Sequence, residues 1–348
     1  DYQVKAEKLL VVAMPMAQYM VYICMIAVCY LGGVQIVEGR LQSGDLISFI
    51  SYIGQVLSAV MMVAMMMVML VMSRASMARI TEVIEEKPSI NDDDAKDIAV
   101  ADGSIEFDDV SFSYNGNPDN PNLEHINLKI ASGETIGIIG GTGSAKSTLV
   151  QLIPRLYDVT SGAVKVAGHN VKDYKIQTLR HSVSMVLQKN VLFSGTIKEN
   201  LKWGNADATD AEIEEACRAA AADGFIKGFP DGYDTELGQG GVNVSGGQKQ
   251  RLCIARALIS KPKIIILDDS TSAVDTATDA AIRKALSEEL SSTTTIIIAQ
   301  RIASVMDADR IVIMNEGKID DVGTHAELMQ RSEIYREVYY SQQKGVEE

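Results

Sequence analysis

The sequence predicts an α-helical transmembrane hairpin joined to an α/β domain that carries a phosphate-binding loop. Two long runs, Leu9–Val37 and Ile47–Met72, contain no charged residue, and each exceeds the ~20 residues that a helix needs to cross a bilayer. From Ser104 onward, short β-rich runs alternate with helical patterns, which is typical of an α/β domain. We therefore expect three segments: transmembrane helices with a cytosolic extension in 1–84, a linker in 85–103 and the α/β domain in 104–348.

The charge is unevenly distributed along the chain. The 348 residues have a formal net charge of −14. Residues 1–80 carry five basic and four acidic side chains, so the acidic excess belongs to the rest of the chain. An acidic surface repels phosphate backbones, and nucleic-acid binding draws most of its affinity from Lys and Arg. We therefore expect no nucleic-acid partner.

The flanking charges predict how the hairpin is oriented. The stretch between the two apolar runs is short and polar, so we expect it to form a tight turn. Lys5 and Lys8 precede the first run, whereas Arg74 and Arg79 follow the second. Positive residues favour the cytosolic side, so both outer ends are expected in the cytosol. A cleavable signal peptide is excluded, because the first run is too long and a second run follows it.

Methionine is concentrated in the hairpin. Residues 1–77 hold 12 of the 16 Met, and those in residues 61–72 would cover most faces of a helix. Met fills irregular contacts well, so an inward face could receive varied apolar cargo. The alternative, which we favour, is plain lipid-facing and helix-packing filler.

The remaining acidic, cysteine and histidine patterns predict no structural metal site. Asp92–Asp94 lie in the polar linker, where consecutive carboxylates are typical of a solvated charge run. The four cysteines have no CxxC spacing, which is typical of reduced, structural residues. The four histidines show no ligand spacing either: His125, His169, His181 and His325.

A strand, a glycine-rich turn and a helix follow one another from Thr135 to Leu156. This arrangement cradles phosphates. We expect backbone amides to face the phosphate oxygens, Lys146 to neutralise their charge and Ser147 to offer a magnesium ligand. The strict pattern has glycine where Ala145 stands. The candidate nucleotide-binding residues are Gly140, Thr142, Gly143, Ser144, Ala145, Lys146, Ser147 and Thr148.

A second phosphate-site element supports this interpretation. Ile264–Leu267 is predicted to be a buried parallel strand, and two carboxylates, Asp268 and Asp269, follow it. Asp268 stands where a magnesium-holding aspartate is expected. Together the two elements predict binding of a nucleoside triphosphate with Mg²⁺.

Between these elements lies Val244–Gln248, followed by a helical stretch. This segment resembles the signature motif of ABC transporters. The resemblance implies an ABC-type P-loop NTPase domain with a RecA-like core and a helical subdomain. It also implies that four residues close over the γ-phosphate of ATP held by a partner domain: Ser245, Gly246, Gly247 and Gln248.

Other positions match the same family over residues 104 to about 341. Tyr114 resembles the adenine-stacking aromatic, Gln188 the glutamine that senses the γ-phosphate and magnesium, and Ser272–Asp275 the cross-dimer loop. The hairpin resembles the last two of the six membrane helices of a type IV ABC exporter. We expect the other four to come from a separate chain or to have been cut away. A P-loop kinase or a soluble ABC protein would not explain a fused hairpin.

Two positions depart from the family pattern where hydrolysis occurs. The family usually has glutamate where Asp269 stands, and retracting the carboxylate by roughly 1 to 1.5 Å costs on the order of 10²-fold in rate. Histidine is common where Gln300 stands, and glutamine donates a hydrogen bond but carries no proton. The candidate catalytic residues are Asp269, Gln300 and Gln188, and the candidate magnesium ligands are Ser147, Gln188 and Asp268.

The resemblance therefore implies an ATP hydrolase coupled to transport, as the degenerate-site subunit of a heterodimeric bacterial multidrug-type exporter. Its cofactors would be ATP and Mg²⁺. Its partners would be a second half-transporter, the lipid bilayer and an unknown apolar or amphipathic cargo. The expected location is a bacterial inner membrane, with the nucleotide-binding domain in the cytosol. Two alternatives stay open: a homodimeric exporter with slow hydrolysis, and a nucleotide-binding regulatory subunit without transport.

Overall fold

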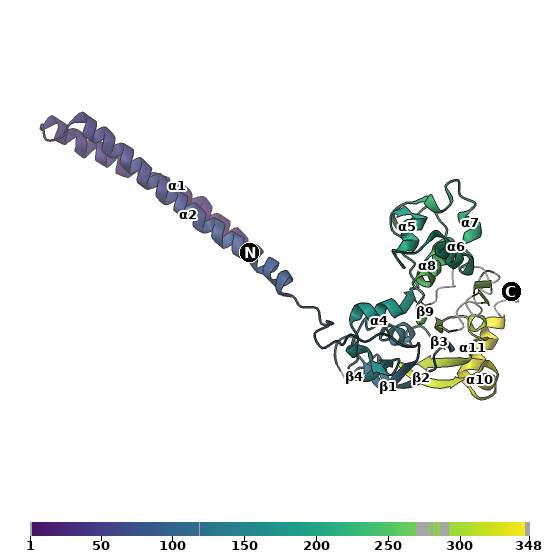
Figure 1. Cartoon of the computed structure of the whole chain (residues 1–348). Helices are drawn as coiled ribbons and strands as arrows, with labels where there is room; N and C mark the ends of the chain where they lie inside the picture. Colours follow the sequence, from purple (N-terminus) through teal and green to yellow (C-terminus); the bar gives the residue numbers. More distant parts are fainter. Residues whose placement is uncertain are drawn as a thin grey trace. The chain divides into compact units, whose positions relative to one another are not determined.

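The computed structural model divides the chain into two compact units, Asp1–Pro88 and Ser89–Glu348 (Figure 1). The structure describes residues 2–117, 119–268 and 292–344, together with Thr278, Ala281, Ile282, Lys284 and Ala285.

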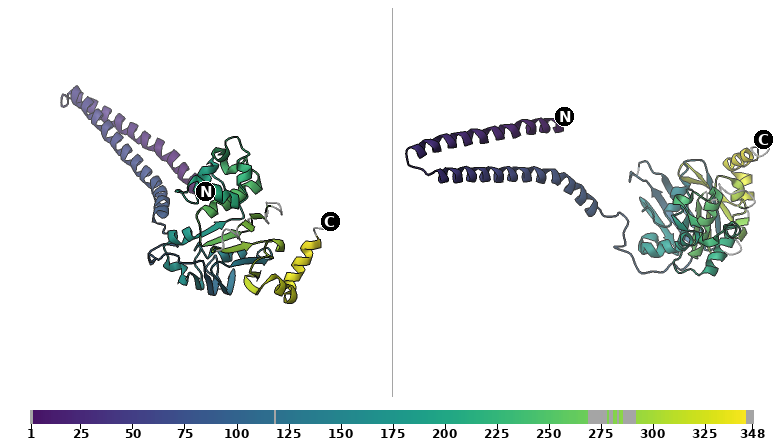
Figure 2. Two further views of the ribbon diagram at one scale, coloured as in Figure 1. Left: turned by 45° about the vertical axis from the view of Figure 1, so that its right-hand side comes forward. Right: turned by 90° about the horizontal axis from the view of Figure 1, so that it is seen from above.

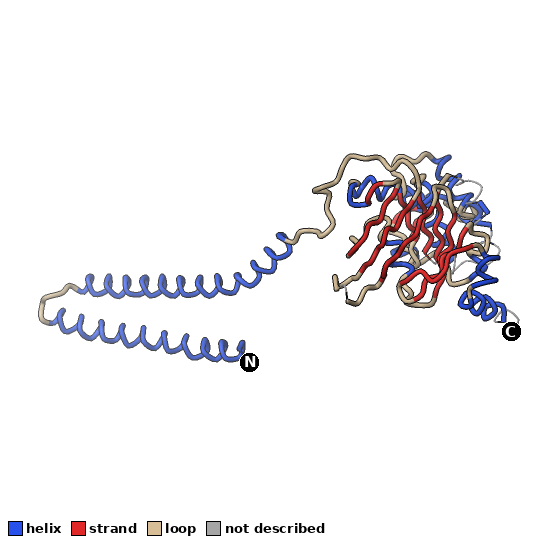
Figure 3. Tube along the Cα trace, turned by 90° about the horizontal axis from the view of Figure 1, so that it is seen from below, coloured by secondary structure: helices blue, strands red, loops and turns tan. Residues whose placement is uncertain are grey.

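Two long helices form the N-terminal unit, α1 (Tyr2–Val37) and α2 (Ser43–Glu85). A short turn joins them, and they run antiparallel as a hairpin (Figure 3). At the start of α2 the Gln42 amide donates to the Asp45 carboxylate at 3.3 Å, which caps the helix. No residue of α2 is buried within the chain. A helix that is apolar on all sides and unburied suits a bilayer, and both helices are long and apolar enough to span one.

A six-stranded sheet lies at the centre of the second unit, in the order β12-β11-β3-β10-β9-β6. The strands from β11 to β6 run parallel, and β12 pairs antiparallel with β11. All residues of β9 and β10 are buried, as expected for parallel strands covered on both faces. The strands are β3 (Thr135–Gly140), β6 (Val183–Val186), β9 (Ile264–Asp268), β10 (Thr294–Ile298), β11 (Arg310–Asn315) and β12 (Lys318–Gly323).

A four-stranded antiparallel sheet, in the order β2-β1-β4-β5, covers one side of this centre. One buried apolar cluster joins the two sheets and the helix α3 (Lys146–Gln151), and it includes Phe107, Leu149 and Ile266. The strands are β1 (Ile105–Phe112), β2 (Leu123–Ile130), β4 (Ser161–Val166) and β5 (His169–Asn170).

Four helices between β6 and β9 form a separate helical group (Figures 1 and 2). The longest, α8, contacts α5 and α6. A second apolar cluster, which includes Ile213, Leu252 and Ile265, joins these helices to the sheet. The helices are α5 (Ile197–Lys202), α6 (Asp210–Ala219), α7 (Asp223–Ile226) and α8 (Gly246–Ile259). The other short elements are α4 (Ile176–Ser182), β7 (Gly195–Thr196), β8 (Glu236–Leu237), α10 (His325–Arg331) and α11 (Glu333–Lys344).

Residues 89–103, which the sequence analysis assigns to a linker, are part of the second unit. The Asp92 carboxylate accepts a hydrogen bond from the Ile176 amide at 2.8 Å. Lys96 forms an isolated bridge with Tyr174, and Val100 is buried. These contacts join residues far apart in the sequence, so the polar composition of the segment gives no sign of them.

Candidate functional site

The glycine-rich turn lies between β3 and α3, at the carboxyl end of β3. Gly140 has no room for a side chain, because a Cβ there would meet the Met314 carbonyl oxygen. The Lys146 ammonium donates to the carbonyl oxygens of Gly140 at 2.9 Å and Gly141 at 2.8 Å. The turn therefore holds a cation among closely spaced backbone groups, as a phosphate cradle requires.

Ala145 explains why the strict pattern has glycine at its position. Its backbone is left-handed, with φ 67° and ψ 25°, a conformation that costs a non-glycine residue roughly 1–2 kcal/mol. Its side chain packs partly buried against the apolar cluster of the two sheets. The loop thus forms with alanine, but at a local conformational cost.

Two of the candidate magnesium ligands lie in direct contact. Asp268 ends β9 and is 6% exposed, and the Ser147 hydroxyl donates to its Oδ1 at 3.1 Å. A hydroxyl and a carboxylate, completed by phosphate oxygens, form the kind of oxygen donor set that Mg²⁺ prefers. The residues therefore fit a nucleotide-bound magnesium ion, which would neutralise phosphate charge when bound.

The sheet topology gathers the other candidates at the same edge. The neighbouring strands β6, β9, β10 and β3 run parallel, and ligands bind where the carboxyl ends of such strands meet. Gln188 follows β6, Asp268 ends β9 and Gln300 follows β10. Gln188 and Gln300 are exposed. Asp269 and the predicted cross-dimer loop Ser272–Asp275 lie outside the described residues.

Tyr114 lies beside the helix that follows the phosphate-binding loop. Its hydroxyl is 3.1 Å from Thr148 Oγ1 and donates to Gln151 Oε1 at 3.3 Å. The side chain is 48% exposed, so part of an aromatic ring is accessible next to the cradle. Such a ring suits stacking against a base.

The predicted signature residues form the start of α8. Ser245 and Gln248 make a capping box, in which the Ser245 amide donates to Gln248 Oε1 at 2.9 Å and Ser245 Oγ accepts from the Gln248 amide at 3.3 Å. Ser245 and Gly246 are exposed. The first amides of a helix have no partner within it, so this end of α8 suits an anion supplied from outside the domain.

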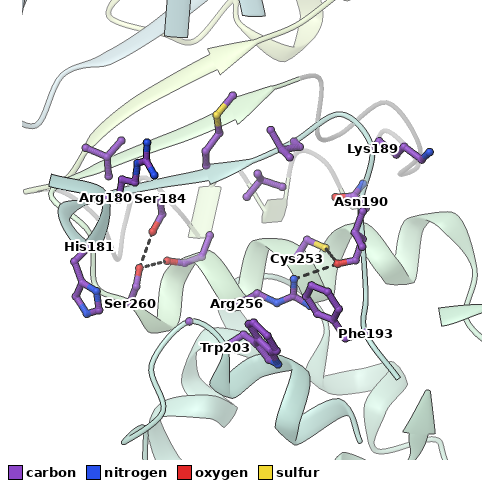
Figure 4. Close-up of a pocket in the computed structure, with 17 residues that line it drawn as sticks. Arg180, His181, Ser184, Lys189, Asn190, Phe193, Trp203, Cys253, Arg256 and Ser260 are labelled. Atoms are coloured by element: carbon purple, nitrogen blue, oxygen red, sulfur yellow. Dashed lines mark hydrogen bonds between the residues drawn. The ribbon is translucent and has the colours of Figure 1, made fainter. Parts of the chain in front are cut away.

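A groove of about 390 Å³ is lined by the end of α4, by β6 and the loop after it, by residues 203–204 after α5, and by α8 (Figure 4). Phe193 and Trp203 stack in it with centroids 4.7 Å apart. Arg256 donates to the carbonyl oxygens of Asn200 at 2.9 Å and Val191 at 3.1 Å, which fixes the loop to α8.

The sequence analysis missed this groove. The described residues that line it include Arg180, His181, Lys189 and Arg256 but no carboxylate, although the domain as a whole is acidic. Leu187 and Lys189, the neighbours of Gln188 in the chain, also line it. The lining residues are spread over residues 180–260, so no local pattern predicts the groove. The one local hint in the sequence is its single Trp, Trp203.

Two of the histidines make polar side-chain contacts, and two of the cysteines are largely removed from water. His325 Nδ1 is 2.7 Å from the Tyr335 hydroxyl, and His125 Nδ1 is 2.8 Å from Asp109 Oδ1. Burial raises the pKa of the Cys217 thiol to about 12 and also raises that of Cys253. Within the described part of the chain, no group of three or more His, Cys, Asp or Glu could hold a metal ion.

Comparisons with known proteins show which proteins this chain is similar to. Residues 123–272 match the ABC transporter family model. A putative multidrug export ATP-binding/permease protein of Staphylococcus aureus is 45% identical over 315 residues, which cover 90% of this chain and 54% of that protein. An ABC transporter ATP-binding protein of Bacillus subtilis is 41% identical over 342 residues, which cover 97% and 58%. The chain thus spans about half the length of these curated relatives.

A solved structure of a bacterial Atm1-family ABC exporter with ATP bound matches with a TM-score of 0.82 and 31% identity, over 93% of this chain and 57% of that one. The fold and site define an ABC-type P-loop NTPase domain joined to helices long enough to cross a membrane, which confirms the predicted fold class. Over the part that it matches, the chain has a type IV-like ABC exporter fold, and it is homologous to multidrug export ATP-binding/permease proteins.

Proposed function

We propose that this chain is the ATP-binding subunit of an ABC exporter, in which ATP binding and hydrolysis drive export across a membrane. The contact between Ser147 and Asp268 carries the proposal, because it joins the phosphate-binding loop to the end of β9 at 3.1 Å. Lys146 lies in the same loop. Together these residues would bind and orient a triphosphate with its magnesium ion.

The hydrolytic half of this site is proposed to be degenerate. Gln300 follows β10. In the sheet, β10 lies between β9, which ends in Asp268, and β3, which leads into the phosphate-binding loop. From there glutamine can donate to a phosphate oxygen but cannot relay a proton. Asp269 is the second reason to expect a degenerate site. Its side chain is shorter than the glutamate that the family usually has there, so its carboxylate orients the attacking water less well. We expect ATP to bind and to be hydrolysed slowly.

The signature residues are proposed to serve the site of a partner. The exposed start of α8, at Ser245 and Gly246, presents a helix N-terminus to an incoming anion. A second half-transporter would bring its own loop-bound ATP to this point. Because this chain's own site is weakened and its signature is nearly intact, we propose a heterodimer, in a bacterial inner membrane with the ATP-binding domain in the cytosol.

The cargo is proposed to be apolar or amphipathic. The Met-rich part of α2 exposes large flexible side chains, among them Met62, Met66 and Met69. Such side chains adapt to varied apolar partners. Some of them would face lipid, and others would line a pathway completed by further helices.

Steady-state ATPase activity of the full chain in lipid nanodiscs tests the degenerate site. We expect wild type to bind Mg-ATP in an equilibrium titration but to turn over well below about 1 per second, the low end of ordinary enzymes. Asp269→Glu combined with Gln300→His is expected to raise turnover by on the order of 10²-fold, because the carboxylate and proton carrier are restored.

Adding Asp268→Asn to the double variant is the matched control and should abolish the gain, because it removes a magnesium ligand. Wild-type turnover of about 1 per second or faster would contradict the degenerate site and favour a homodimeric exporter. Wild type that binds no ATP would contradict the proposed function itself.

A further inference from the structure

Three aromatic rings form a closed cluster at the edge of the nucleotide site. Phe112 and Tyr114 meet edge to face with centroids 4.9 Å apart and planes at 80°, and Tyr114 meets Tyr157 at 5.0 Å and 89°. Phe112 and Tyr157 also touch, at 5.6 Å. Phe112 is buried, whereas Tyr157 is 41% exposed. The cluster therefore fixes the Tyr114 ring to the core from two sides and leaves it partly open to solvent.

The loop that carries Tyr157 is rigidly held. The buried Arg155 donates to the Asp158 carboxylate at 2.8 Å. Arg180 on α4 donates to the carbonyl oxygen of Pro154 at 3.1 Å and to that of Arg155 at 2.8 Å.

The same loop is also bonded to the strand that leads to Tyr114. The Ser113 amide donates to Thr160 Oγ1 at 3.0 Å, and the Thr160 amide donates to the Ser111 carbonyl at 2.9 Å. The ring of Tyr157 is thus presented by a segment with a fixed position relative to β1.

We propose that Tyr157 is a positioning residue for nucleotide binding, which acts by holding the Tyr114 ring edge-on so that one ring face stays directed to the base. The hydroxyl of Tyr114 is already anchored by Thr148 and Gln151. Contacts at the hydroxyl alone leave the ring free to rotate about the axis that joins Cβ to the hydroxyl oxygen, and the edge contact with Tyr157 removes that freedom before the ligand arrives. The proposal rests on the proposed function, because it requires Tyr114 to stack on the base of a bound nucleotide.

The role belongs to the ring of Tyr157 and not to its hydroxyl. An edge-to-face contact depends on the aromatic quadrupole, which phenylalanine keeps. Leucine fills part of the same space but has no aromatic quadrupole. Two ligands separate contacts with the base from contacts with the phosphates, because tripolyphosphate keeps the phosphates of ATP but has no base.

The test is calorimetric titration of the full chain in lipid nanodiscs with Mg-ATP and with Mg-tripolyphosphate. Tyr157→Ala and Tyr157→Leu are expected to weaken ATP binding about 3- to 10-fold and to leave tripolyphosphate binding within about 2-fold of wild type. Tyr157→Phe is expected to bind both as wild type does. Tyr340→Ala is the matched control, because Tyr340 is also a half-exposed tyrosine in edge-to-face contact, at 5.6 Å from Tyr339.

Several results would overturn the proposal. Unchanged ATP affinity in Tyr157→Ala and Tyr157→Leu would show that the ring gives no support. Equal losses for ATP and tripolyphosphate would assign Tyr157 to the folding of the domain, and a loss in Tyr157→Phe would assign the effect to the hydroxyl. If wild type binds tripolyphosphate and ATP with equal affinity, base stacking itself fails, and the proposed function survives only as phosphate binding.

Discussion

Single residues show how the sequence identifies the nucleotide-binding site and where it departs from the strict phosphate-binding pattern. Lys146 and Ser147 follow from local spacing alone, and the structure places them in contact with the loop carbonyls and with Asp268. Ala145 is different. Its departure from glycine is visible in the sequence, but the left-handed backbone that makes it costly is not, because that conformation is imposed by the turn between β3 and α3.

Replacing Ala145 with glycine tests this cost. In an ordinary helix interior, Ala→Gly lowers stability by about 1 kcal/mol. At position 145 the relief of roughly 1–2 kcal/mol of left-handed strain offsets the entropy that glycine loses on folding. We therefore expect Ala145→Gly to leave the free energy of unfolding unchanged or to raise it by up to about 1 kcal/mol.

Urea denaturation of the full chain is the measurement, and Ala255→Gly in the buried part of α8 is the comparison. That variant should lose about 1 kcal/mol or more. An equal loss at both positions would mean that Ala145 is not strained.

At the scale of elements, strong local patterns were predictable and distant contacts were not. The phosphate-binding turn, the strand before Asp268 and the helix after Ser245 each have a local sequence signature, and each element forms where it is expected. The groove with Trp203 draws its walls from residues 180–260, and the segment around Asp92 is held by Ile176. Neither can be read from periodicity, because only the folded chain brings those residues together.

The start of α8 allows helix capping to be separated from phosphate binding. Ser245→Ala removes the side-chain oxygen that accepts from the Gln248 amide and should cost about 1 kcal/mol of stability. Ser245→Asp keeps a good cap, so its stability should match wild type. Its negative charge would repel a γ-phosphate, so ATPase activity of the assembled transporter should fall with both variants.

Denaturant midpoints and ATPase rates of the assembly, measured on the same preparations, separate the two roles. Full activity in Ser245→Asp would argue against contact with phosphate at this position.

At the scale of the whole molecule, the helical hairpin and the nucleotide-binding unit are stabilised in different ways, the hairpin by a lipid environment and the second unit by its own apolar core. The hairpin has no buried residue in α2, so lipid or other helices must cover it. The second unit has two buried apolar clusters of its own. Nucleotide should therefore stabilise the second unit without stabilising the hairpin, and magnesium should add to this effect through ligands that include Ser147 and Asp268.

Thermal unfolding of the chain in nanodiscs checks this coupling. At about 100 times the dissociation constant, Mg-ATP should stabilise the second unit by about 2.7 kcal/mol, which raises its Tm by roughly 5–10 °C for a domain of this size. Chelation of magnesium with EDTA should remove part of the rise in wild type. In Ser147→Ala and in Asp268→Asn, EDTA should remove a smaller part of the rise than in wild type, because each variant lacks one of the magnesium ligands. If EDTA does not change the rise in Tm of wild type, then Ser147 and Asp268 bind each other and not a nucleotide-bound ion.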